Sequence, residues 1–225
     1  MSENTSDGMP TPKVESESIV AHFSDGLLMH FAKEETIISG LDEPEGVYLI
    51  KEGFVKAYSV SKAGNANLLL VHEAGEFIPL PWALDGAHTT GLYYEAMTDV
   101  TVLRASKDKL RAAMGNNSWL SQEVLKQTVN ILSVYSNRIQ TLEFRSARGR
   151  VISGLLNYAE RFGKISGNKV TINAPITQQD IADSINMTRE TANIALGQLF
   201  EEGLVGQDEH LFIILDLAGL QAAQS

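Results

Sequence analysis

The apolar and polar positions between Ile176 and Val205 repeat with a helical period and predict two helices joined by a tight turn. Ile181 and Ile185 give the first helix a buried face. The second helix has an apolar face of its own, made of Ala192, Ala195, Leu196 and Leu199. Asn186 stands where the chain must reverse, and asparagine tolerates left-handed backbone well. We therefore expect a helix-turn-helix unit in this stretch.

Threonines stand at the predicted starts of both helices. Thr177 and Asp180 form a Thr-x-x-Asp capping pattern, and Thr188 is a good N-cap for the second helix. The outward side of the second helix carries polar residues near its start, as in helices that reach base edges in a DNA major groove. The candidate DNA-contacting residues are Thr177, Gln178, Gln179, Thr188, Arg189, Glu190, Asn193 and Ile194. By pattern alone, a surface hairpin with solvated polar residues fits equally well.

From Glu34 to Ser106 the pattern changes to short runs rich in β-branched and aromatic residues, separated by turn residues. The runs are Val47–Ile50, Phe54–Val60, Leu68–His72 and Val100–Arg104. Evenly spaced short strands of this kind predict a small antiparallel roll or barrel.

Between Ser118 and Phe144 one long helix is predicted, and it carries two apolar stripes. The first stripe contains Val124, Thr128, Ile131, Tyr135 and Leu142. The second contains Leu125, Val129, Leu132 and Ile139. One stripe can pack on the roll, while the other needs a further partner, such as a second copy of the helix. A helix held between two domains of one chain would explain both stripes equally well.

A helix over residues 146–162, a strand over 169–172 and a hairpin ending at 211–215 complete a C-terminal winged helix-turn-helix. The sequence thus predicts an α+β protein with four parts. They are a disordered tail (1–18), an antiparallel strand domain (19–117), a long helix (118–144) and a winged helix-turn-helix domain (145–225).

The formal net charge of the 225 residues is −10, which by itself argues against a nucleic-acid partner. The distribution of the charge weakens this argument. Residues 1–143 hold 11 Lys+Arg against 19 Asp+Glu, and residues 144–225 hold 7 Lys+Arg against 9 Asp+Glu. The acidity therefore lies mostly away from the proposed reading helix. No apolar run is long enough for a bilayer span and no leader opens the chain, so we expect a cytoplasmic protein without membrane contact.

The residue types present give little support to a catalytic or metal-binding function. Cysteine is absent, which excludes disulfides, thiolate catalysis, cysteine-bound zinc and iron–sulfur clusters. Roll-shaped cupin enzymes bind metal through a His-x-His pair, but the histidines here are scattered. They are His22, His30, His72, His88 and His210. We predict no enzyme activity, no metal site and no cofactor.

The strings Ile-Thr-Gln-Gln-Asp-Ile-Ala and Met-Thr-Arg-Glu-Thr-Ala-Asn resemble the winged helix-turn-helix of the CRP/FNR family of transcription regulators. The residues that match the family's residue types are Thr177, Gln179, Arg189, Glu190 and Thr191. A weaker similarity runs from Phe31 to Leu215, and the predicted roll is similar to the family's cyclic-nucleotide-binding domain. The resemblance implies that residues 19–117 form a sensory antiparallel double-stranded β-roll of the jelly-roll type. It implies that the helix over residues 118–144 is a dimerisation helix, and we assign its first stripe to the interface. It also implies a homodimer that binds double-stranded DNA, and it adds RNA polymerase as a candidate partner.

The family holds the cyclic phosphate with a short helix that opens with Gly-Glu and is followed by an Arg-Ser or Arg-Thr pair. In the corresponding stretch, residues 75–99, Pro79 and Pro81 are expected to forbid that helix. No lysine or arginine occurs between Lys62 and Arg104. Burying a phosphate charge without a cation costs several kcal/mol, so we expect no cyclic nucleotide to bind.

The same stretch contains polar and aromatic residues that suggest a pocket for an uncharged ligand. The candidate pocket residues are Glu76, Trp82, His88, Tyr93 and Tyr94. Alternatively they form roll core and a surface loop, and a haem bound through His72 or His88 is a third interpretation. The effector is unknown.

The predicted function is that of a dimeric transcription regulator that reads an inverted-repeat operator through the helix over residues 188–201, without a response to cyclic nucleotides. The alternative is a ligand- or protein-binding roll module that has lost sequence-specific DNA binding. The acidic wing tip, Asp208 and Glu209, and the low basic charge motivate this alternative.

Overall fold

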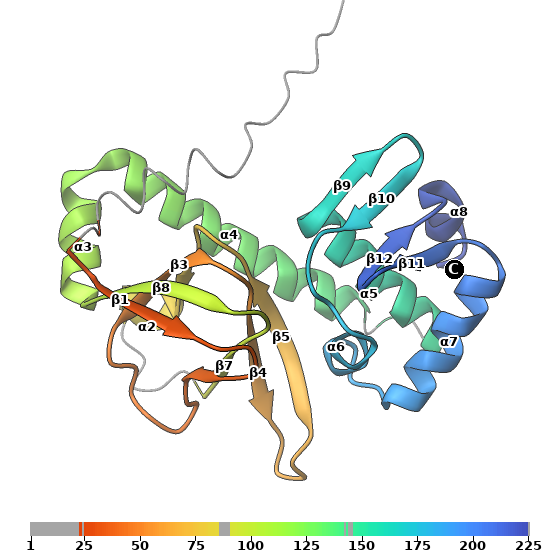
Figure 1. The fold of residues 1–225 in the computed structure, drawn as a ribbon, viewed down its shortest axis with the longest axis horizontal. Helices are drawn as coiled ribbons and strands as arrows, with labels where there is room; N and C mark the ends of the chain where they lie inside the picture. The colour runs from red at the N-terminus through yellow and green to blue at the C-terminus, as the bar shows by residue number, and fades with distance from the viewer. Residues whose placement is uncertain (1–22, 24, 86–90, 142, 144–145, 225) are drawn as a thin grey trace, which may run out of the picture.

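The computed structural model of the chain describes residues 23, 25–85, 91–141, 143 and 146–224. The predicted tail over residues 1–18, the candidate pocket residue His88 and the predicted interface residue Leu142 lie outside the described residues. The described parts form a β-roll, a long helix and a smaller C-terminal α/β unit (Figure 1).

Strands β1 to β8 form the roll as two four-stranded antiparallel sheets, in the orders β1-β8-β3-β6 and β2-β7-β4-β5. They span Leu27–Phe31 (β1), Thr36–Ile38 (β2), Val47–Glu52 (β3), Val55–Val60 (β4), Ala66–His72 (β5), Phe77–Ile78 (β6), Tyr93–Ala96 (β7) and Val100–Ala105 (β8). Ile50 and Val102 from one sheet share a core cluster with Ala57 and Leu70 from the other. The predicted antiparallel roll is confirmed, because alternate side chains of both sheets meet inside it.

A short helix, α2 (Leu80–Asp85), follows β6. The expectation that Pro79 and Pro81 forbid a helix here is wrong. Pro79 precedes the helix and Pro81 lies in its first turn, where a backbone N–H would have no partner inside the helix. The helix places Trp82 in a core cluster with side chains of α3 (Lys107–Asn116).

The long helix α4 (Ser118–Thr141) packs one apolar stripe on the roll of the same chain. This is the stripe that was assigned to the dimer interface, and its described members are Val124, Thr128, Ile131 and Tyr135. Val124 is only 1% exposed, Ile131 and Tyr135 contact the roll core, and the Thr128 hydroxyl donates to its own helix. The assignment is corrected for Val124, Ile131 and Tyr135, because these side chains pack on the roll of the same chain, whereas Thr128 is exposed and stays a prediction. The second stripe faces solvent, with exposed fractions of 63% for Leu125, 51% for Val129, 67% for Leu132 and 68% for Ile139.

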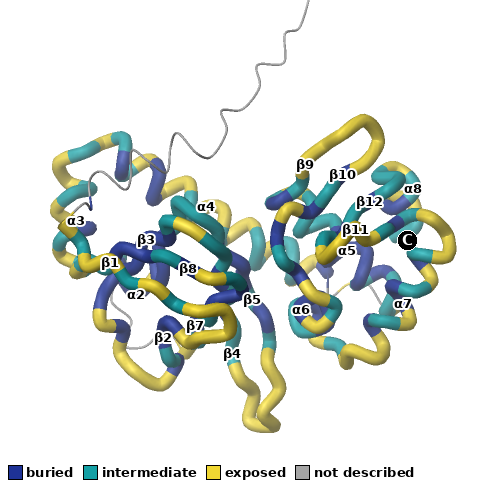
Figure 2. The backbone as a smooth tube through the Cα atoms, in the orientation of Figure 1, coloured by how far each residue is buried: buried dark blue, intermediate teal, exposed yellow. Residues whose placement is uncertain are grey.

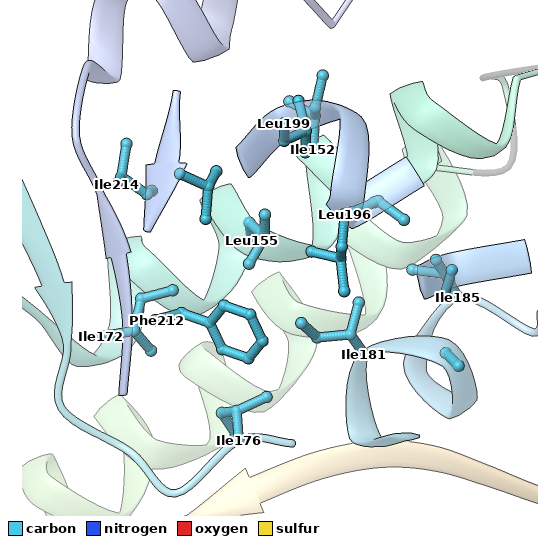
Figure 3. Close-up of a cluster of buried hydrophobic side chains, with 14 of the residues drawn as sticks. Ile152, Leu155, Ile172, Ile176, Ile181, Ile185, Leu196, Leu199, Phe212 and Ile214 are labelled. Atoms are coloured by element: carbon cyan, nitrogen blue, oxygen red, sulfur yellow. The ribbon is translucent and has the colours of Figure 1, made fainter. Parts of the chain in front are cut away.

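The C-terminal unit begins with α5 (Ala147–Phe162) and contains the predicted winged helix-turn-helix. Its other elements are β9 (Gly163–Ser166), β10 (Lys169–Ile172), α6 (Gln178–Ser184), α7 (Arg189–Glu201), β11 (Val205–Asp208), β12 (Leu211–Ile214) and α8 (Leu217–Ala222). The four strands form one sheet in the order β11-β12-β10-β9. Leu155, Ile181, Leu196 and Phe212 meet in its core (Figure 3).

The C-terminal unit packs directly on the roll. Leu68 and Val71 of β5 belong to the same core cluster as the side chains of α5 and α6, and the rings of Phe54 and Phe162 meet edge to face at 6.1 Å. The β4–β5 hairpin is accordingly exposed at its tip and buried along the part of β5 that lies beside the C-terminal unit (Figure 2). Helix α6 therefore lies against the roll in this arrangement.

Candidate nucleic-acid interface

Side-chain caps determine the geometry of the helix-turn-helix. The Thr177 hydroxyl accepts from the Asp180 N–H at 3.1 Å, and the Asp180 carboxylate accepts from the Thr177 N–H at 2.8 Å. Asn186 has φ 53° in the turn, and the Thr188 hydroxyl accepts from the Thr191 N–H at 3.2 Å. The predicted capping box, left-handed turn and N-cap are confirmed, and each cap stabilises its helix by about 1 kcal/mol.

Helix α7 presents a polar face to solvent. Its apolar side, formed by Ala192, Ala195, Leu196 and Leu199, is buried in the core as predicted. On the opposite side a shallow surface hollow is lined by Arg189, Glu190, Asn193 and Ile194. Ile194 is 62% exposed, and a Cβ added at Gly197 would meet no atom within 4 Å. The first turns of α7 thus form an open surface that another molecule can reach.

The start of α6 lies beside this face, but part of its polar chemistry is already used. The Thr177 hydroxyl donates to the Asp180 carboxylate at 2.5 Å, and the Gln179 amide donates to Asp183 at 2.7 Å. Thr177 and Gln179 are exposed and Gln178 is half-buried. For Thr177, the capping role leaves little of the side chain for a second partner.

The wing and the start of α5 add few available cations. The guanidinium of Arg148 makes two hydrogen bonds to the Glu202 carboxylate, at 2.7 and 2.6 Å. The hydrogen bond from Arg148 lowers the pKa of Glu202. The wing tip between β11 and β12 carries exposed Asp208 and Glu209. The described charges of the wing and of the start of α5 would therefore attract a phosphate backbone only weakly.

The structure does not bring the described candidate pocket residues together, which corrects that prediction. Trp82 lies in the core between α2, α3 and the roll, with the Lys107 ammonium 4.9 Å from its ring centroid. Tyr94 lies inside the roll, and Tyr93 stacks on Tyr58 at 5.5 Å between ring centroids. These side chains point into separate environments because neighbouring residues of a strand face opposite sides of a sheet.

Glu76, the remaining described member of that set, faces the C-terminal unit. Its carboxylate accepts two hydrogen bonds from Arg161 of α5, at 2.6 and 2.9 Å, and lies 2.6 Å from Nδ1 of the buried His72. Burial alone would raise the pKa of Glu76, but the positive Arg161 and the hydrogen bonds outweigh it and hold the pKa below its usual range. The sequence analysis missed Arg161, since nothing in its local pattern marks a partner 85 residues earlier.

Within the described ranges, no group of three or more His, Asp or Glu side chains is placed to hold a metal ion. Among the described helices, none combines the length and the apolar character that crossing a membrane requires.

The sequence profile of the cyclic nucleotide-binding domain matches residues 28–117, and that of the Crp-like helix-turn-helix domain matches residues 149–223. Among characterised relatives, the global nitrogen regulator of Nostoc sp. is 30% identical over 177 residues, which are 78% of this chain and 79% of the relative. The CRP-like cAMP-activated global transcriptional regulator of Mycobacterium tuberculosis is 26% identical over 204 residues, 90% of either chain.

Solved structures agree on the fold. FixK2 from Bradyrhizobium japonicum has a TM-score of 0.73 at 23% identity, with 89% of this chain and 98% of that chain covered. A mutant of CooA from Carboxydothermus hydrogenoformans has a TM-score of 0.76 at 20% identity, with 91% and 90% covered.

A sensory-type roll, a long helix and a winged helix-turn-helix with an open reading face together define a DNA-binding transcription regulator. The chain belongs to the CRP/FNR family of transcription regulators.

Proposed function

We propose that this regulator acts as a homodimer that reads an inverted-repeat operator with the first turns of α7. The observation that carries the proposal is the solvent-exposed hollow lined by Arg189, Glu190, Asn193 and Ile194. The proposed contacts to the operator backbone come from Thr177, Gln178, Gln179 and Thr188 at the starts of the two helices. Helix starts suit phosphate because their N–H groups and dipoles attract negative charge.

Each base-reading side chain has a distinct chemistry. Glu190 accepts a hydrogen bond from a cytosine amino group, and Arg189 donates to guanine O6 and N7 or to a nearby phosphate. Ile194 cannot donate a hydrogen bond, but it packs on a thymine methyl group. We therefore propose a half-site with a G·C pair opposite Arg189 and Glu190 and a T·A pair opposite Ile194.

The proposed dimer interface is the exposed stripe of α4, Leu125, Val129, Leu132 and Ile139. An isolated helix face with this much exposed aliphatic surface is unfavourable in water, and pairing with a second copy removes it. Two-fold pairing along α4 would place two copies of α7 about one DNA turn apart, roughly 10 bp between half-site centres.

We propose that the roll does not bind a cyclic nucleotide in the manner of the family. The segment from Ala63 to Leu103 supplies no cation, and the roll interior is filled by the side chains of its own two sheets. The cAMP activation named for the Mycobacterium tuberculosis relative is therefore not carried over to this chain. The proposed location is the cytoplasm, with RNA polymerase as a partner at the promoter and no catalytic activity of the chain itself.

A second candidate function is a ligand- or protein-binding module without sequence-specific DNA binding, favoured by the acidic wing and by the Arg148–Glu202 pair. Selection of binding sites from random duplex DNA at low salt distinguishes the operator-reading regulator from this second candidate. Enrichment of a palindromic motif supports the reader, and failure to enrich any palindrome, with or without cell extract, supports the second candidate.

A further inference from the structure

The roll, the long helix and the DNA-binding domain meet at one junction (Figure 1). Two adjoining hollows lie at this junction. The smaller, of about 50 Å³, is lined by residues of β5, α4, α5 and α6. The larger, of about 310 Å³, lies between α4 and the helix-turn-helix. The two share Arg138, Thr141, Ser184 and Ile185 in their walls. The larger volume exceeds the roughly 150 Å³ that accommodates benzene in an engineered protein cavity.

The walls of both hollows differ in charge from the rest of the chain. They contain Arg138, Arg150 and Arg161 but no aspartate or glutamate, although the chain as a whole has a net charge of −10. Arg161 is neutralised by Glu76. Arg138 is the guanidinium common to both hollows, and its surroundings decide what the site can bind.

Arg138 is a half-buried cation whose partners are neutral. It donates to the carbonyl of Leu68 and, at 2.8 Å, to the side-chain oxygen of Asn67. Among the described residues, no carboxylate forms an ion pair with it. These contacts use two of the five N–H donors of a guanidinium. Burial lowers the pKa of Arg138, which expresses the cost of holding this charge away from water without a counter-charge.

The remainder of the wall is mostly apolar. Val134 of α4 and Phe162 of α5 line the smaller hollow. Tyr135 and Ile139 of α4 line the larger one, and Ile185 after α6 lines both. An unpaired guanidinium next to apolar surface is the arrangement that recognises an anion carried on an apolar body.

We propose that the larger hollow at this junction is a binding site for a small organic carboxylate, with the carboxylate on Arg138 and the apolar body against Tyr135 and Ile185. The site lies between the domains, outside the interior of the roll. A ligand here contacts α4, α5 and α6 together, so its binding is linked to how the DNA-binding domain is held. That link to DNA affinity rests on the proposed function, whereas binding itself is measurable without DNA.

Benzoate, benzamide and inorganic phosphate are the probes, titrated calorimetrically into the full-length protein. Benzoate has both a carboxylate and an apolar ring. Benzamide has the same size without the charge, and phosphate has charge without an apolar body. We expect benzoate to bind about ten-fold more tightly than either of the others. Arg138→Gln is expected to weaken benzoate binding about ten-fold or more. Arg111→Gln is the matched control, because Arg111 of α3 also donates to neutral acceptors, the carbonyls of Ala83 and Leu84, but lines neither hollow.

Crystals of the wild-type protein soaked with 4-bromobenzoate provide a test that needs no variant. The anomalous signal of bromine is expected in the junction, near Ile185. Bromine found only inside the roll, or no binding of benzoate in solution, overturns the proposal. Equal affinities for benzoate and benzamide, or an unchanged affinity in Arg138→Gln, also overturn it, because the charge would then play no part.

Discussion

Glu76 of the roll and Arg161 of α5 form an ion pair with two hydrogen bonds, of 2.6 and 2.9 Å, across the boundary between the two domains. Both side chains are 17% exposed, so water competes little for either. The pair is part of the same boundary as the Phe54–Phe162 ring contact and the packing of Leu68 on the DNA-binding domain. Its charges therefore contribute to how the reading helix is held relative to the roll.

Replacing Arg161 by Met is expected to lower the free energy of unfolding by about 3–5 kcal/mol, because the Glu76 carboxylate would be left buried without its counter-charge. The double variant Glu76→Gln/Arg161→Met is expected to recover part of that loss, measured by urea denaturation. Arg148→Met is the control, since its partner Glu202 is exposed to solvent and the change in stability should be much smaller. Equal losses in the two single variants would contradict a special role of the buried pair.

The pH dependence of stability follows from the lowered pKa of Glu76. A carboxyl whose pKa is lower in the folded state stabilises the fold above its unfolded value, and this contribution is lost as the pH falls through the folded pKa. The difference in unfolding free energy between wild type and Glu76→Gln should therefore be constant near neutral pH and shrink in acid below about pH 4.5. Glu73 has a pKa raised by burial and by Glu76, so the same comparison with Glu73→Gln should show the opposite sign.

Replacing Ile194 by Arg is expected to shift the preferred base toward guanine at the position that this side chain reaches, because arginine donates to O6 and N7. The measurement is the motif selected from random duplex DNA. Glu190→Ala should instead weaken binding by about 1–3 kcal/mol and relax the preference at one position. If Ile194→Arg leaves the selected motif unchanged, Ile194 lies outside the groove and the proposed docking of α7 is wrong.

Replacing Leu132 by Glu is expected to convert the proposed homodimer into a monomer, because it places a charge in the middle of the exposed stripe of α4. Sedimentation equilibrium gives the mass directly. Asn130→Glu adds the same charge to the same helix, on an exposed residue at least 100° around the helix from every member of the stripe, and should leave the dimer intact. A dimer that survives Leu132→Glu would place the interface elsewhere.

Calorimetric titration with cyclic AMP and cyclic GMP is expected to give no binding at micromolar concentrations. The prolines are no longer a reason, since α2 forms despite them, but the segment from Ala63 to Leu103 still lacks a cation for the phosphate. A micromolar dissociation constant would show that cations from outside this segment reach the phosphate. Arg138→Gln would then separate the two possible places, because binding at the domain junction depends on Arg138 and binding inside the roll does not.

Local patterns were sufficient for the helix-turn-helix. The Thr177–Asp180 capping box, the left-handed Asn186 and the Thr188 cap all depend on residues within a few positions of each other. Their side-chain chemistry therefore determines the backbone whatever the rest of the chain does. The roll was likewise predictable, since strands of alternating or fully apolar residues between turns have few other ways to be buried.

The tertiary structure alone decided what packs against what. Two stripes of α4 have equally apolar sequences, and only the position of the roll shows that Val124 is covered while Leu132 is exposed. Pro81 is compatible with α2 only because it lies in the first turn of the helix, and the local sequence does not show where the helix begins. The contacts of Glu76 with Arg161 and of Arg138 with Leu68 join positions 85 and 70 residues apart. Such pairs form when the domains pack together. The free energy of that packing comes from burial over the whole interface, so no local sequence pattern predicts the pairs.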